Sequence, residues 1–171
     1  MDIAELSDIQ SESGVIGTLI YHPEFILHTD YLQPGYFFGV ENGCIYWAIQ
    51  ELYKSGITNI DAYNISNKLQ SNKSVQKTIE KYNLPSVQEF IELYKETARH
   101  TMEEYKMLAD NIVTLAFKRD LVKTLNQLSA NCFNPDYELE KLNNVVYGEL
   151  DKLTQKYIST NDIHILGNDI D

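Results

Sequence analysis

Apolar residues recur every three or four positions along most of this chain, which is the spacing of amphipathic helices. The clearest case is residues 41–54, where one face would hold Ile45, Ala48, Ile49, Leu52 and Tyr53. The same reasoning predicts further helices over residues 11–20, 61–69, part of 71–84, 86–98, 102–128 and 134–157, and another that begins at Pro23. No Asn-Gly or Asp-Gly pair joins two alternating runs, as a β-hairpin would require. The pattern therefore predicts an all-α fold.

Capping and turn residues support several of these limits. Gly56 is a natural stop for the helix predicted over residues 41–54, and Asp61 is a good N-cap for the helix predicted over residues 61–69. Ser86 with Glu89 has the spacing of a capping box. Asn134, followed by a proline and an acid, predicts the start of the last helix.

Two glycines interrupt the first predicted helix. Gly14 and Gly17 each cost about 1 kcal/mol relative to alanine inside a helix. We expect the close approach of a neighbouring helix to be the reason for them. Residues 1–10 are polar, and we expect them to be frayed.

The long helix predicted over residues 102–128 has two apolar stripes. One consists of Tyr105, Leu108, Ile112, Leu115 and Val122, and the other of Val113, Phe117, Leu121 and Leu125. The last helix carries a seam with alternating spacings of three and four, which is typical of an antiparallel hairpin: Leu139, Leu142, Val146, Leu150, Leu153 and Tyr157. The sequence thus predicts a small globular helical bundle (residues 1–98), a long two-helix antiparallel hairpin (99–158) and the start of a linker (159–171).

The second stripe of the long helix is the best candidate for an interaction face. The competing interpretation is that it packs back on the bundle, and the apolar pattern leaves both open because it measures burial and not the partner. The candidate interaction residues on the two hairpin faces are Val113, Phe117, Leu121, Leu125, Leu142, Val146, Leu150 and Leu153.

Composition narrows the functional classes. The chain has 171 residues, 43% of them hydrophobic, so it can form a folded core. With 14 basic against 25 acidic residues, direct binding of nucleic acid by this segment is not expected. Neither a signal peptide nor a run long enough to span a membrane is evident, so we expect an intracellular chain with Cys44 and Cys132 reduced and buried.

Catalytic and metal-binding patterns are weak. The histidines have carboxylates nearby, as in His22 with Glu24, but three or four convergent ligands are needed for zinc. We interpret them as solvated surface residues. No Gly-x-x-x-x-Gly-Lys-Ser/Thr loop occurs, so this segment is not a P-loop ATPase. We expect no catalytic residue, cofactor or metal here.

The order of these features resembles the N-terminal domain of DnaB-type replicative DNA helicases. The similar segments are residues 12–20 (ESGVIGTLI), 32–37 (LQPGYF), 45–52 (IYWAIQEL), 60–69 (IDAYNISNKL), 109–113 (ADNIV) and 118–121 (KRDL). The resemblance covers residues 10–158 and is carried by the order of the segments more than by any one of them. The chain departs from the family at residues 82–85 (YNLP), where relatives commonly have a Gly-Gly pair, and this divergence suits a phage or mobile-element relative.

The resemblance implies a non-catalytic assembly and docking domain acting in the cytoplasm. Its expected partners are further copies of itself in the collar of a ring, and a primase or a helicase loader. ATP and magnesium would belong to a motor domain that follows the linker. The alternative is a free-standing regulator that caps a host helicase, which would be favoured if the reading frame stopped at Asp171.

Overall fold

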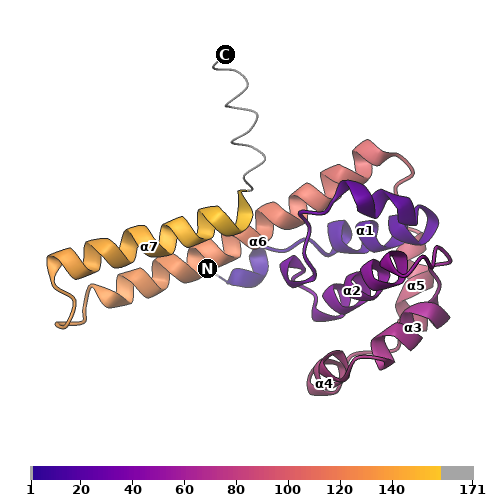
Figure 1. Cartoon of the computed structure of the whole chain (residues 1–171), viewed down its shortest axis with the longest axis horizontal. Helices are drawn as coiled ribbons and strands as arrows, with labels where there is room; N and C mark the ends of the chain where they lie inside the picture. Colours follow the sequence, from indigo (N-terminus) through magenta and orange to yellow (C-terminus); the bar gives the residue numbers. More distant parts are fainter. Residues whose placement is uncertain (1, 159–171) are drawn as a thin grey trace, which may run out of the picture. The chain divides into compact units, whose positions relative to one another are not determined.

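Helices are the only regular secondary structure in the part of the chain that the structure describes. A computed structural model describes residues 2–158, and within them helices are joined by turns, with no strand (Figure 1). The all-α prediction is therefore confirmed. The linker expected over residues 159–171 lies outside the described residues. In chain order the elements are η1 (Ile3–Glu5), α1 (Ile9–Tyr21), η2 (Pro23–His28), η3 (Pro34–Tyr36), α2 (Val40–Lys54), α3 (Ala62–Gln70), α4 (Lys73–Tyr82), α5 (Val87–Lys95), α6 (Met102–Asn131) and α7 (Leu139–Tyr157).

Two compact units divide the chain. Among the described residues, the bundle unit is Ser7–Thr114, and the hairpin unit combines residues 2–6 with residues 115–158. Helix α6 contributes to both, because the division falls within it. The domain limits predicted after residues 98 and 158 stay predictions. Among the described helices, none is both long and apolar enough to cross a membrane.

Helix α1 begins earlier than predicted because Asp8 caps it. The Asp8 carboxylate accepts hydrogen bonds from the backbone N–H groups of Gln10 and Ser11, at 3.0 and 3.1 Å, and one from the Ser11 hydroxyl at 2.7 Å. Burial raises the pKa of Asp8, but these bonds outweigh it and hold the pKa below its ordinary value. Asp2 caps η1 in a similar way. The expectation that residues 1–10 are frayed is therefore wrong for the described residues 2–10.

The glycines of α1 allow the close approach that the sequence predicts. A Cβ atom on Gly17 would lie 1.9 Å from the carbonyl oxygen of Tyr94, in the backbone of α5. A Cβ on Gly14 would lie 2.7 Å from Cδ1 of Leu108, the end of a flexible side chain. The prediction is confirmed at both positions, and the contact at Gly17 is the stricter because backbone must move.

A buried carboxylate joins α1 to the start of α2. Glu12 is 2% exposed, and its oxygens accept hydrogen bonds from the backbone N–H groups of Phe38 (2.5 Å) and Gly39 (3.1 Å) and from the Asn42 amide (2.8 Å). Tyr94 of α5 donates to Asn42 at 2.6 Å, which extends the network to a third helix. An anion at this helix N-terminus satisfies N–H groups that have no partner within α2.

Helices α2, α3 and α5 supply much of the bundle core. Their buried apolar residues are Ile45, Tyr46, Ala48, Ile49, Leu52, Ile65, Leu69, Val87, Ile91 and Tyr94. Two predicted boundaries are confirmed, since Gly56 follows α2 with φ +80° and the Asp61 side chain caps α3 through the N–H of Asn64. The prediction that Ser86 and Glu89 form a capping box is wrong. The Ser86 side chain makes no capping hydrogen bond, and its backbone carbonyl instead accepts the N–H of Glu89 at 3.1 Å.

The N-terminal part of the first stripe of the long helix packs into the bundle unit, whereas Val122, in the hairpin unit, is exposed. Tyr105, Ala109 and Ile112 of α6 are buried there, and the Tyr105 hydroxyl is 2.7 Å from the Thr29 hydroxyl. Burial raises the pKa of Tyr105 well above its ordinary range, so the group stays neutral. This part of α6 is therefore core.

Neither cysteine is fully buried, contrary to prediction. Both are free thiols; Cys44 on α2 is half-buried and Cys132 is exposed. Cys132 is exposed because it lies just beyond the last residue of α6, in the turn that leads to α7.

Candidate interaction surface

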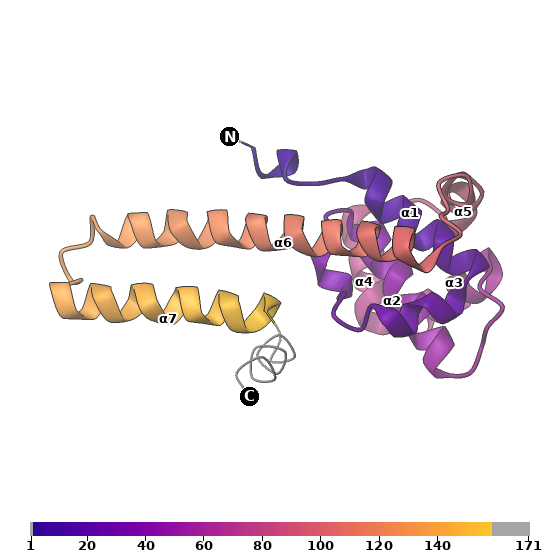
Figure 2. The ribbon, with the colours of Figure 1, turned by 90° about the horizontal axis from the view of Figure 1, so that it is seen from above.

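Helices α6 and α7 form an antiparallel pair within the hairpin unit. Both views show α7 beside the C-terminal part of α6 (Figures 1 and 2). The Lys156 ammonium lies 2.8 Å from the Asp120 carboxylate, and the Tyr157 hydroxyl donates to the same carboxylate at 2.5 Å. The ring of Phe117 meets that of Tyr157 edge-on, with centroids 5.4 Å apart. The end of α7 is thus fixed against the part of α6 that enters the hairpin.

The Asp120 carboxylate on α6 accepts hydrogen bonds from both Lys156 and Tyr157 of α7. Burial raises its pKa, but the hydrogen bonds from Lys156 and Tyr157 and the charge of Lys156 outweigh burial and hold the pKa below its ordinary value. Asp120 is therefore ionised near neutral pH, and it stabilises the pairing of the two helices.

Arg119 fixes the N-terminal segment on the same part of α6. Its Nη1 donates to the carbonyl oxygen of Leu6 at 2.6 Å, and the residue is almost fully buried. Leu6 therefore lies against the Arg119 side of α6, and a partner cannot use that side of the helix unless this segment moves.

The turn between the helices differs from the sequence prediction. Asn134 does not cap α7, which begins at Leu139. The Asn134 side chain instead accepts the N–H of Asp136 at 3.0 Å, and its carbonyl accepts the N–H of Tyr137 at 3.1 Å. Asparagine followed by proline is equally suited to a β-turn with proline at its second position. Asn134 and Pro135 form such a turn here and do not start a helix.

The eight candidate interaction residues differ in exposure. Leu153 is buried, and Leu125 is 49% exposed. The other six are partly buried: Val113, Phe117, Leu121, Leu142, Val146 and Leu150. Phe117 is engaged with α7 inside the hairpin. The structure therefore does not bring the eight together as one exposed face, and their role in binding stays a prediction.

Five large apolar side chains within residues 122–147 of the hairpin unit are exposed. We define the hairpin surface as Val122, Leu125, Phe133, Leu139 and Tyr147. Phe133 and Leu139, on either side of the turn, are each 87% exposed. Of these five, sequence reasoning selected only Leu125 as an interaction residue. Phe133 carries a signal that could have found it, since it is a large aromatic residue in a turn with no helical stripe to join.

His22, His28 and His100 are the histidines within the described residues. No group of three His, Cys, Asp or Glu residues is placed to hold a metal ion within residues 2–158. Instead His22 and His100, 78 positions apart, share a hydrogen bond of 3.1 Å between Nε2 and Nδ1. His22 also stacks on Phe25 and lies 3.7 Å from Glu24. This pair could not be predicted from the sequence, because only the tertiary fold brings the two rings together.

Comparison with known families gives one match. A family model described as "DnaB-like helicase N terminal domain" matches residues 4–110. The match covers more than half of the chain, includes α1–α5 and the first part of α6, and ends before α7. No curated protein matches the sequence.

Proposed function

Because this chain belongs to the family of DnaB-like helicase N-terminal domains, we propose that it is a non-catalytic assembly and docking domain of a replicative DNA helicase. It would act in the cytoplasm by associating with further copies of itself and by binding a primase or a helicase loader. The family match is the observation that carries this proposal.

The hairpin surface supports self-association. Large apolar side chains that remain exposed in a folded domain are typical of sites that bind another protein when they occur together. The hairpin unit has five of them within residues 122–147, two of which flank one turn. Aromatic residues such as Phe133 and Tyr147 are enriched among those that dominate binding energy at protein interfaces.

Charge favours a protein partner over DNA. The formal net charge is −11, and DNA binding would require basic residues to neutralise phosphates. No phosphate-binding loop occurs in the sequence. In this proposal ATP and magnesium therefore belong to a motor domain and not to these residues.

Native cysteines provide a test of self-association. Cys132 is exposed next to Phe133, whereas Cys44 lies in the bundle unit, where burial and the charge of Glu41 raise the pKa of its thiol. We expect alkylation of Cys132 by iodoacetamide to slow several-fold as protein concentration rises, because association covers the turn. Alkylation of Cys44 should keep its rate and serves as the internal control. Mass spectrometry of both peptides against time measures this; a Cys132 rate independent of concentration would count against the hairpin surface as the site of association.

A further inference from the structure

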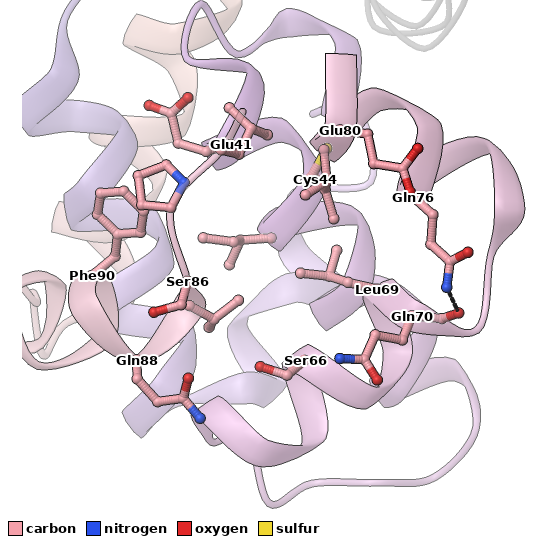
Figure 3. Close-up of a pocket in the computed structure, with 15 residues that line it drawn as sticks. Glu41, Cys44, Ser66, Leu69, Gln70, Gln76, Glu80, Ser86, Gln88 and Phe90 are labelled. Atoms are coloured by element: carbon pink, nitrogen blue, oxygen red, sulfur yellow. Dashed lines mark hydrogen bonds between the residues drawn. The ribbon is translucent and has the colours of Figure 1, made fainter. Parts of the chain in front are cut away.

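A pocket in the bundle unit lies outside the hairpin surface, and an inference about its ligand rests on the partner docking proposed above. It has a volume of about 590 Å³ and is lined by residues of α2, α3, α4 and α5 and the turn before α5 (Figure 3). This volume is within the range of sites that bind small ligands. The pocket is therefore large enough for a bulky apolar group.

The inner wall of the pocket is apolar and belongs to the packed core of the bundle unit. Ile45, Leu69 and Val87 line it and belong to the buried core of the bundle unit. Ile79 and Phe90 add two half-buried apolar side chains nearer the opening. Apolar surface that remains accessible beside a packed core favours an apolar ligand, because burial removes it from water.

Helix α4 forms one side of the pocket, and its apolar face remains partly accessible to solvent. None of its ten residues is buried, although it is amphipathic and Ile79 faces the pocket. The Gln76 side-chain amide donates to the carbonyl of Gln70 at the end of α3, and this bond, drawn in Figure 3, ties α4 to α3. A ligand in the pocket would complete the burial of Ile79.

The pocket lining is negatively charged, which favours a ligand that carries a positive charge. Glu41 and Glu80 are the charged residues among those that line it, and no lysine or arginine does so. Neither carboxylate forms an ion pair within residues 2–158. Figure 3 shows both on the same side of the pocket, opposite Ser66 and Gln88. A ligand with an apolar group in the pocket and a positive charge at this side would match the lining in shape and sign.

We propose that this pocket binds a short segment of a partner protein that presents a large apolar side chain next to lysine or arginine. A peptide segment fits because the residues at the opening, including Glu80, Pro85 and Ser86, are exposed and leave room for a chain that continues past the site. The inference is independent of self-association through the hairpin.

The test uses the whole chain and two matched peptides. Acetyl-Lys-Phe-Leu-Arg-amide is titrated into ¹⁵N-labelled protein, and backbone amide shifts are followed by NMR; acetyl-Glu-Phe-Leu-Glu-amide is the control peptide. We expect shifts centred on Ile79, Val87 and Phe90, with affinity for the basic peptide at least about five-fold higher, the size of effect that exposed ion pairs give. The double variant Glu41→Gln/Glu80→Gln should reduce that preference, while Glu89→Gln, at an exposed α5 residue outside the lining, should retain it.

Two results would overturn the proposal. One is the absence of saturable shifts at the lining residues with the basic peptide at millimolar concentration. The other is equal binding of both peptides, which would show that the carboxylates do not select the ligand. The spectrum of each unliganded variant, compared with that of the unmodified protein, shows whether its fold is retained.

Discussion

Replacement of Gly17 by alanine is expected to lower the free energy of unfolding by about 3 kcal/mol, at the upper end of the cost of overpacking a core. The reason is a backbone contact: the new Cβ would lie 1.9 Å from the carbonyl oxygen of Tyr94. No rotamer change relieves this overlap, so α1 and α5 must separate. Urea denaturation followed by the fluorescence of Trp47, the single tryptophan, measures the loss within the bundle unit.

Two other glycines serve as controls for this substitution. A Cβ on Gly35, in the same unit, or on Gly148, in α7, would meet no atom within 4 Å. Gly35→Ala should leave the free energy of unfolding of the bundle unit nearly unchanged. Gly148→Ala should stabilise α7 by about 0.5–1 kcal/mol, because alanine favours the helix more than glycine does. If Gly17→Ala and Gly35→Ala had the same free energy of unfolding, the close contact between α1 and α5 would be contradicted.

Replacement of Glu12 by glutamine is expected to cost about 2–4 kcal/mol, because it removes hydrogen bonds to a charged group and leaves buried donors unsatisfied. One Glu12 oxygen accepts from Phe38, and the other accepts from Gly39 and Asn42. In glutamine one of these oxygens becomes an NH₂ group, which would then face a donor. The substitution therefore creates a donor–donor conflict in either orientation.

Glu89→Gln is the control for this charge change, since Glu89 is exposed on α5. Thermal unfolding followed by circular dichroism at neutral pH compares the two variants with the unmodified chain. If Glu12→Gln melted at the same temperature as Glu89→Gln, the buried network would not stabilise the bundle as we argue.

The sequence predicted well those features that depend on local pattern. The faces of α2 and α3 follow from helical spacing, and Gly56 and Asp61 end and begin helices as their backbone and side-chain chemistry favours. Asn134 shows the limit of this reasoning. The same residue type suits a helix cap and a turn, and only the structure decided between them.

Tertiary features were less accessible from sequence. The role of Glu12 depends on partners 26 to 30 positions away, and that of His22 on a partner 78 positions away. No spacing rule encodes such pairs. The candidate interaction residues raised a related difficulty, because an apolar stripe indicates burial without naming what covers it. Thus Phe117 is used inside the hairpin, whereas Phe133, outside every stripe, is exposed.

The central claim, association through the hairpin surface, is tested most directly by the solution mass of the chain over a concentration series, measured by light scattering. We predict a mass that rises above one copy for the unmodified chain and stays at one copy for Phe133→Ser/Leu139→Ser. The control Leu27→Ser/Leu93→Ser, at two exposed apolar residues of the bundle unit, should associate like the unmodified chain. A single-copy mass at every concentration, or equal association of both double variants, would contradict the claim.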